Sequence, residues 1–217
     1  MTPDPTPFNT LLSWLQTCQT DAGPPPPEDH TSLFQHLERE LDVDVPEDLK
    51  HYFRLLNPYL AQQEQGLFYG LTAIPLQYAL GEREEWLSGV IIDPSSPLVT
   101  AVDPPGTVRP VAFDAGWLPL AHDHSGAYLA ADLRPGVGGH IGQIINFGSR
   151  ELKRFVLAAS ISEFFADLLR NIADGRVEQT CEAGAVSLGF TDPEVGHPLD
   201  LCEQFGASAL RPTGSVP

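Results

Sequence analysis

Two histidines separated by one residue, His122 and His124, form the first pattern in the chain that could bind a metal ion. If this segment is a strand, both imidazoles lie on one face, with Asp123 between them and His140 close by across a hairpin. A protein zinc site needs three or four converging ligands, supported by hydrogen bonds behind them. Because two such histidines are more common as ordinary surface residues, the sequence predicts no metal site and no other cofactor.

The same segment contains the residue types of a hydrolytic triad, namely Asp123, His124 and Ser125. Side chains of adjacent residues point in diverging directions, so these three cannot form the chain of nucleophile, base and orienting carboxylate. The chain also lacks the G-x-S-x-G turn that presents the nucleophilic serine in many hydrolases. We therefore expect a protein without enzymatic activity and assign no catalytic residue. A small hydrolase or metal enzyme built on residues 122–140 is the least favoured hypothesis.

A glycine-rich segment follows, and it suggests a loop that could hold a phosphate group. Its glycines are Gly136, Gly138, Gly139 and Gly142. Such a loop needs a helix N-terminus directly after it, whereas the residues that follow here, IGQIINF, have the composition of a strand. The prediction is therefore a wide hairpin turn.

Carboxylates are concentrated between residues 28 and 48, where Arg39 is the one arginine or lysine. The eight acidic residues are Glu28, Asp29, Glu38, Glu40, Asp42, Asp44, Glu47 and Asp48. One interpretation is a solvated helix face that aids solubility. The other is a docking surface that attracts a basic partner over long range. The candidate partner-binding residues, including a second patch on a later helix, are Glu38, Glu40, Asp42, Asp44, Glu47, Asp48, Glu82, Glu84 and Glu85.

The whole chain is acidic, because its 217 residues include 12 basic and 29 acidic side chains and carry a formal net charge of −17. Such a charge argues against nucleic acid and anionic membranes as partners. No apolar run approaches the length of roughly 18 residues that spans a membrane, and no signal peptide is recognisable, so we expect a cytoplasmic protein. The three cysteines, Cys18, Cys181 and Cys202, are widely spaced, which predicts reduced thiols and no disulfide framework.

Apolar residues at helical spacing predict four helices in the first part of the chain, over about 6–21, 29–41, 46–57 and 75–87. The third should end at Asn57, because Pro58 disfavours helical geometry in the residue before it. Pro24 to Pro27 predict a stiff polyproline spacer. A last helix should begin after Ser160, which forms a capping box with Glu163, and end at Gly175.

Short β-branched and aromatic runs between turn residues predict strands at 90–92, 99–102, 108–113, 117–120, 127–133, 141–147 and 155–158. Several should pair antiparallel, because their connections are too short for crossover helices. The predicted fold class is α+β, with an antiparallel-rich mixed sheet packed by helices. We divide the chain into an N-terminal helix and polyproline spacer (1–28), one domain (29–175) and an irregular extension (176–217).

Several segments also follow one family pattern in order and near spacing. They are ERELDVDVPEDLKHY from Glu38, GLFYG from Gly66, Trp86, WLPLAHDHSGAYLAADLRPGVGGHIGQIINFG from Trp117, and VLAASISEFFADLL. The chain resembles the SUKH superfamily over roughly Leu33 to Gly175. Within it, the branch named after the fungal Smi/Knr cell-wall-assembly regulators is the most similar.

This resemblance implies an α+β domain that binds proteins and has no catalytic residues. Family members in bacteria are mostly immunity proteins that neutralise toxins, many of them nucleases, and fungal members are scaffolds in cell-wall signalling. The leading hypothesis is therefore a bacterial immunity protein that blocks a cognate, possibly basic, toxin through its acidic surface. The alternative is a scaffold or regulatory module in cell-wall or envelope signalling, which recruits proteins through its N-terminal helix and the 176–217 extension.

Overall fold

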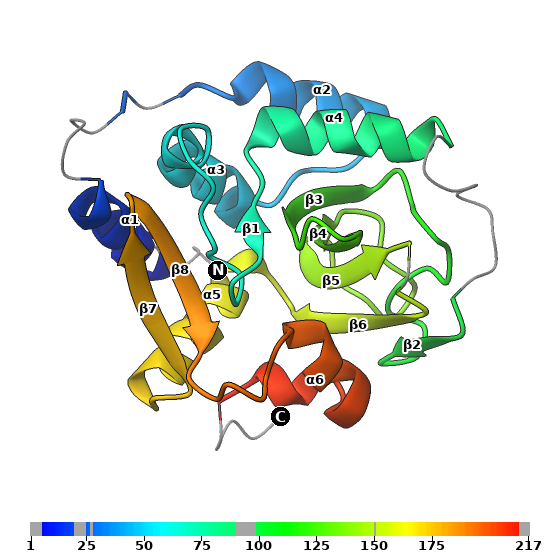
Figure 1. Cartoon of the computed structure of the whole chain (residues 1–217). Helices are drawn as coiled ribbons and strands as arrows, with labels where there is room; N and C mark the ends of the chain where they lie inside the picture. Colours follow the sequence, from blue (N-terminus) through cyan, green and yellow to red (C-terminus); the bar gives the residue numbers. More distant parts are fainter. Residues whose placement is uncertain (1–5, 20–24, 27, 90–98, 150, 213–217) are drawn as a thin grey trace.

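The computed structural model describes residues 6–19, 25–26, 28–89, 99–149 and 151–212 (Figure 1). The strand predicted at 90–92, two of the four spacer prolines (Pro24 and Pro27) and the last five residues of the predicted extension lie outside these ranges. The described part combines helices with a mostly antiparallel sheet, which confirms the α+β prediction. None of the described helices is long and apolar enough to cross a membrane.

All five predicted helices are present, and a sixth follows them. The helices are α1 (Thr6–Cys18), α2 (Thr31–Leu41), α3 (Glu47–Leu60), α4 (Leu76–Leu87), α5 (Ile161–Ala173) and α6 (Pro198–Phe205). Ser160 caps α5 as predicted, because its side chain accepts a hydrogen bond from the backbone N–H of Glu163 at 3.2 Å. The Glu163 carboxylate in turn accepts the backbone N–H of Ala159 at 3.0 Å. Gly175 follows the helix with a φ of +73°, a conformation that suits glycine at a helix end.

The predicted end of the third helix is wrong, since α3 continues through Pro58 to Leu60. Pro58 removes one backbone hydrogen bond of the helix, which costs stability. Burial of Tyr59 and Leu60, each 4% exposed, offsets that cost. The buried Asn57 amide also accepts the backbone N–H of Leu76 at 2.6 Å, which joins the last turn of α3 to the start of α4.

The main sheet has six strands in the order β1-β3-β4-β5-β6-β2, in which only β2 pairs in parallel. The strands are β1 (Thr72–Ala73), β2 (Ala101–Asp103), β3 (Trp117–His122), β4 (Ala127–Asp132), β5 (Gln143–Gly148) and β6 (Lys153–Ala158). The four strands predicted between 117 and 158 are confirmed, and the one at 99–102 corresponds to β2. Short hairpin connections explain the antiparallel pairing of β3, β4 and β5.

The strand predicted at 108–113 is wrong, because that segment consists of bends and turns. Its apolar residues are nevertheless buried, with Val108 at 2% and Phe113 at 3% exposure. The buried Arg154 guanidinium donates hydrogen bonds to the carbonyls of Val111 and Ala112 at 3.0 Å each. A side chain therefore satisfies backbone groups that a neighbouring strand would otherwise have to pair.

Two hydrophobic clusters lie against the sheet. The larger one contains the buried faces of α1, α2, α3 and α5. The smaller one is aromatic and gathers Trp86, Phe113, Trp117 and Phe147, with Tyr128 packed against it. The rings of Trp86 and Phe147 meet edge to face with their centroids 5.4 Å apart, so the last turn of α4 packs against β5.

Most of the segment 176–217 is ordered rather than irregular, so that prediction is wrong for the described residues. It forms a hairpin of β7 (Val177–Glu182) and β8 (Ala185–Phe190), then α6 and a 3₁₀ turn over Ala207–Leu210. Five of the six residues of β7 are exposed, which hides the apolar alternation that reveals a strand. The hairpin is held to the domain by Gly66, whose N–H and carbonyl bond to Val186 and Leu188 at 2.8 and 2.9 Å.

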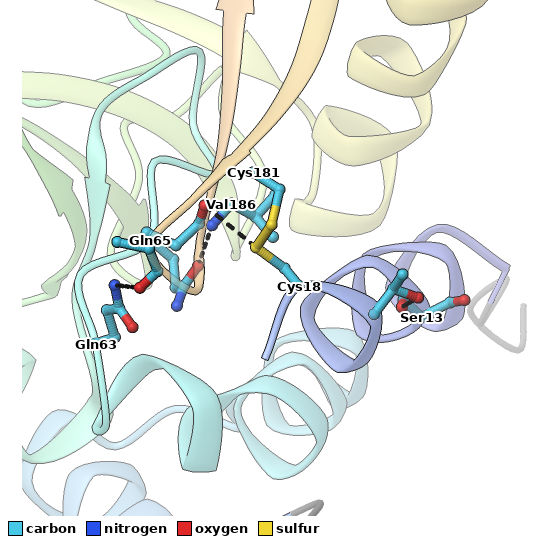
Figure 2. Close-up of a disulfide and its surroundings, with 9 residues drawn as sticks. Ser13, Cys18, Gln63, Gln65, Cys181 and Val186 are labelled. Atoms are coloured by element: carbon cyan, nitrogen blue, oxygen red, sulfur yellow. Dashed lines mark hydrogen bonds between the residues drawn. A yellow bond between two sulfur atoms is a disulfide. The ribbon is translucent and has the colours of Figure 1, made fainter. Parts of the chain in front are cut away.

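The prediction of reduced thiols is wrong for two of the three cysteines. Cys18 at the end of α1 forms a disulfide with Cys181 on β7, with Cα atoms 5.8 Å apart (Figure 2). The pairing arises from the fold, because α1 packs beside the hairpin although the two cysteines are 163 residues apart in sequence. Cys202 is a buried free thiol.

Candidate functional site

The structure brings the two predicted acidic patches together, because α2 and α4 lie side by side (Figure 1). Arg83 of α4 is 4% exposed and donates to both carboxylate oxygens of Glu40 of α2, at 2.7 and 3.2 Å. Its Nε donates to the carbonyl of Ala115 at 2.6 Å. The hydrogen bonds from Arg83 hold the pKa of Glu40 below its usual value. The two parallel hydrogen bonds between Arg83 and Glu40 hold the C-terminal halves of α2 and α4 against each other.

Glu38 of α2 and Glu47 of α3 both form salt bridges with Lys50 of α3. Lys50 lies between them, with Nζ 2.8 Å from a carboxylate oxygen of Glu38 and 3.0 Å from one of Glu47. Glu38 also accepts the backbone N–H of Val45 at 3.1 Å. The hydrogen bond from Lys50 is the main cause that lowers the pKa of Glu38. Glu38 therefore serves mainly to shape the loop between α2 and α3.

Two further predicted residues form hydrogen bonds within the domain. Asp48 is 7% exposed and accepts the backbone N–H of Ser162 at 3.3 Å, which ties α3 to the first turn of α5. Glu82 accepts the phenol O–H of Tyr128 at 3.0 Å. Both carboxylates thus have partners within the domain.

Four exposed predicted residues at or just after the ends of α2 and α4 form no salt bridge with another described residue. We call them the acidic surface: Asp42, Asp44, Glu84 and Glu85. Asp42 caps α2 in the left-handed conformation with a φ of 53°, and Glu84 and Glu85 occupy the last turns of α4. The ion pair between Arg83 and Glu40 joins the two helices whose ends carry these charges.

A groove of about 450 Å³ opens on another flank of α4, and we call it the histidine groove. Its walls come from the end of α3 and the residues after it, from β1, from the start of α4 and from the end of β3. The polar and aromatic residues that line it are Gln62, Gln63, Glu64, Thr72, Tyr78, Glu82, His122 and His124.

The two imidazoles meet at the base of this groove, with centroids 4.1 Å apart. His122 stacks on Tyr128, and burial, with the neighbouring His124, lowers the pKa of His122. His124 Nε2 lies 3.0 Å from Thr72 Oγ1 and 3.8 Å from a carboxylate oxygen of Glu64. The pair therefore borders a carboxylate on one side and an aromatic ring on the other.

His140 lies at the opposite end of β4 from this pair, so its expected closeness across a hairpin is wrong. The antiparallel register places His122 beside Tyr128 at the start of β4, whereas His140 precedes β5 at the far end. Among the described residues, no group of three or more histidine, cysteine or acidic side chains is arranged to hold a metal ion.

Asp123 closes the turn between β3 and β4. Its carboxylate accepts the backbone N–H groups of Ser125 and Ala127 at 2.8 and 2.9 Å and also the Ser125 hydroxyl. His197 Nε2 lies 3.6 Å from the same carboxylate. The carboxylate thus stands between the serine and the imidazole, whereas a triad needs the imidazole in the middle.

The glycine-rich segment forms the predicted hairpin connection between β4 and β5, and it is packed against residues 106–107. A Cβ atom on Gly136 or Gly139 would lie 2.2 Å from the carbonyl oxygen of Gly106 or Thr107, respectively. Gln143 Nε2 donates to the Thr107 carbonyl at 2.9 Å and to Asp132 at 3.0 Å. Burial raises the pKa of Asp132 to about 6. These residues close one end of the sheet.

Sequence reasoning identified Glu82 and the two histidines but missed Glu64, Thr72 and Tyr78. Tyr78 is 68% exposed and lies four residues before Glu82, so both project from one face of α4. That four-residue spacing could have identified Tyr78 as a neighbour of Glu82 from the sequence. No sequence signal places Glu64 or Thr72 beside His124, because the three belong to separate elements.

Comparison with known proteins identifies relatives of the central part of the chain. The model of the SMI1 / KNR4 family (SUKH-1) matches residues 30–167, which run from the start of α2 into α5. The "Cell wall biosynthesis/cell cycle regulator smi1" of Schizosaccharomyces pombe is 31% identical over 152 residues, covering 64% of this chain and 30% of that protein. The "Cell wall assembly regulator SMI1" of Saccharomyces cerevisiae is 26% identical over 173 residues, covering 64% and 34%.

A third relative, the "Glucan synthesis regulatory protein" of Neurospora crassa, is 38% identical over 73 residues, which cover 34% of this chain and 14% of that protein. The matches to these three fungal proteins span about a third of their length or less. Helix α1, the β7–β8 hairpin and α6 lie outside the residues that the family model matches.

Proposed function

Because the chain belongs to the SMI1 / KNR4 family (SUKH-1), we propose that it is a non-catalytic domain that binds a basic partner protein through the acidic surface. The observation that carries this proposal is the ion pair between Arg83 and Glu40, which joins the helix end before the exposed Asp42 and Asp44 to the helix that carries the exposed Glu84 and Glu85. Patches about 40 residues apart in sequence thus belong to neighbouring helices. The surrounding carboxylates hold the two helices in place, and these four are left for a partner.

Charge gives this surface a physical role. A net charge of −17 attracts a basic protein over long range, and oriented attraction of this kind raises association rates by about 10- to 1,000-fold at low salt. Rim charges of this type act mainly on the association rate and on its salt dependence. The same charge repels nucleic acid, so a nucleic-acid partner is not part of the proposal.

The finer proposal is that the partner is a toxin domain and that this protein is its immunity protein. A toxin that cleaves nucleic acid presents basic residues in its active cleft, because it must bind phosphates. An acidic domain seated on that cleft excludes the substrate without any chemistry of its own. The SUKH-type resemblance of the chain and its acidic surface both support this assignment.

The second candidate is a regulatory module that acts on cell-wall synthesis. The names of the Schizosaccharomyces pombe and Saccharomyces cerevisiae relatives favour it, since both are called regulators of the cell wall. In this case the acidic surface would recruit a component of the synthetic machinery.

The test is capture of proteins from a lysate of the native host at low and high salt, with two charge variants of equal size. The first variant is D42K/D44K/E84K/E85K. The control changes four exposed carboxylates elsewhere, E178K/E182K/E194K/E203K, on β7, on α6 and between β8 and α6. We expect the first variant to lose capture of a basic protein by at least about tenfold, and the control to lose less than about twofold.

Equal losses in both variants would mean that net charge alone matters, and no loss in the first variant would contradict the proposal. The captured protein then separates the two candidates. If the protein is an immunity protein, its captured partner has a toxic activity, such as nucleic-acid cleavage, and the protein inhibits it. If the protein is a regulator, its captured partner has no toxic activity. Deletion of α1 is not a clean test, because Phe8, Leu11 and Leu15 are fully buried in the main core.

A further inference from the structure

We propose that the histidine groove binds one arginine side chain of the partner protein. The inference rests on the proposed function, because it needs a basic partner, but it concerns a separate flank of α4. The acidic surface attracts the partner, and the groove receives a single residue of it.

The groove is large enough to receive a side chain. Its volume of about 450 Å³ falls within the range of roughly 300–1,000 Å³ that is typical of small-ligand sites. Its walls come from α3 and the residues after it, β1, α4 and β3, so it is built by four segments rather than by one flexible loop.

The charge of the groove favours a cation. Two carboxylates, Glu64 and Glu82, line it, and the described residues of its walls include no lysine or arginine. The Glu64 side chain is 77% exposed, while Glu82 is held by the hydroxyl of Tyr128 at 3.0 Å. One carboxylate is thus positioned and the other is free to close on a ligand.

The aromatic side chain at the rim favours arginine over lysine. Tyr78 is 68% exposed, more than any other described tyrosine or phenylalanine. A guanidinium stacks on an aromatic face and also binds a carboxylate through two parallel hydrogen bonds, whereas an ammonium behaves as a point charge. Tyr78 and Glu82, one helical turn apart, offer both contacts from one face of α4.

The titratable groups that face the groove are Glu64, Glu82, His122 and His124, with Tyr78 at the rim. Burial and the neighbouring His124 lower the pKa of His122, which favours its neutral form. A neutral imidazole does not repel a guanidinium.

The experiment uses the full chain and two blocked peptides, acetyl-Gly-Arg-Gly-amide and the same peptide with citrulline, which has nearly the shape of arginine but no charge. Binding is followed by NMR through the ring signals of His122, His124 and Tyr78 at pH 8 and low salt. We expect saturable shifts for the arginine peptide with a Kd on the order of 1–10 mM. The citrulline peptide should bind at least about fivefold more weakly.

The variant E64Q/E82Q should weaken the arginine peptide by about fivefold, whereas E178Q/E194Q should leave it unchanged. Glutamine keeps an oxygen that accepts the Tyr128 hydroxyl, and an unchanged unfolding midpoint confirms that the variant is folded. Equal binding of both peptides, shifts confined to residues outside the groove, or no saturable shift would each overturn the inference.

Partner capture separates this inference from the proposed function. If D42K/D44K/E84K/E85K abolishes capture and E64Q/E82Q leaves it unchanged, the groove is not used and the proposed function stands. If neither variant changes capture, both fail. If each variant weakens capture, both are supported.

Discussion

The two ends of the β3–β4–β5 sheet are built in opposite ways. At the closed end, Gly136 and Gly139 pack against the backbone of residues 106–107, and Gln143 joins Asp132 to the Thr107 carbonyl. At the open end, the β3–β4 turn carries two imidazoles into a groove of about 450 Å³ that has an exposed tyrosine at its rim. One end is filled by backbone contacts, and the other leaves polar side chains facing solvent.

This difference separates structural residues from candidates for function. Asp132, Gly142 and Gln143 belong to the resemblance pattern, and each has a partner or a close packing contact within the domain. Glu64 and Tyr78 lie in the open groove and outside that pattern. These three residues of the resemblance pattern therefore maintain the fold, whereas the proposed arginine contacts lie outside it.

The largest expected effect on the unfolding free energy comes from the disulfide, which anchors the β7–β8 hairpin next to the open end. Residues 65–66 follow the groove wall and hydrogen-bond to β8, while Cys181 on β7 ties that hairpin to α1 (Figure 2). The variant C18S/C181S should lose about 2–4 kcal/mol of unfolding free energy, because a long loop is no longer closed in the unfolded chain. Urea unfolding measures this loss.

Hydrogen exchange of the same variant locates the effect. Amides of residues 62–66 should lose more protection than those of the closed end, such as Gln143. A thiol reductant should reproduce the loss in the natural chain and change nothing in C18S/C181S. Uniform loss of protection over the whole sheet would contradict the local role of the disulfide.

The next effect tests the close packing at the closed end. Gly136→Ala should cost about 2–3 kcal/mol of unfolding free energy, since its Cβ would lie 2.2 Å from a carbonyl oxygen. Gly138→Ala is the matched control, because its nearest neighbours would lie 3.7 Å away, which is ordinary contact. Equal costs for the two substitutions, measured by urea unfolding, would show that the closed end can relax.

A smaller effect concerns Asp132, whose pKa burial raises to about 6 from a usual 3.8. A raised carboxyl pKa means that the folded state binds the proton more tightly, so ionisation costs stability above pH 6 and protonation relieves that cost as the pH falls. Between pH 7 and pH 5, the natural chain should therefore gain about 1.4 kcal/mol relative to Asp132→Asn. Urea unfolding of both chains at the two pH values measures this gain, and an unchanged difference between them would contradict it.

The smallest effect is expected at the open end. Tyr78→Ala should change the unfolding free energy by less than about 0.5 kcal/mol, because its side chain is largely exposed. Tyr59→Ala is the buried counterpart, at 4% exposure, and should cost about 3 kcal/mol. A large loss for Tyr78→Ala in thermal unfolding would show that the rim of the groove is structural.

Local patterns in the sequence determined most of the backbone. Apolar residues at helical spacing predicted α1 to α5, and short β-branched and aromatic runs between turn residues predicted β3 to β6. Capping by Ser160 and the hairpin at the glycine-rich segment were also predictable, because both depend on neighbours within a few residues. The same reasoning failed at 108–113, where Arg154, more than 40 positions away, satisfies the backbone.

The sequence alone also determined the charge, the acidic residues and the family pattern. Only the tertiary structure decided which carboxylates have partners within the domain, since Glu40 and Asp48 have the same composition signal as Asp42 and Asp44 but bind Arg83 and the start of α5. It also decided the Cys18–Cys181 pair and the meeting of Glu64, Tyr78 and His124 around one groove. The physical reason is range: helix and strand propensities act between near neighbours, whereas pairing of distant side chains depends on how the whole core packs.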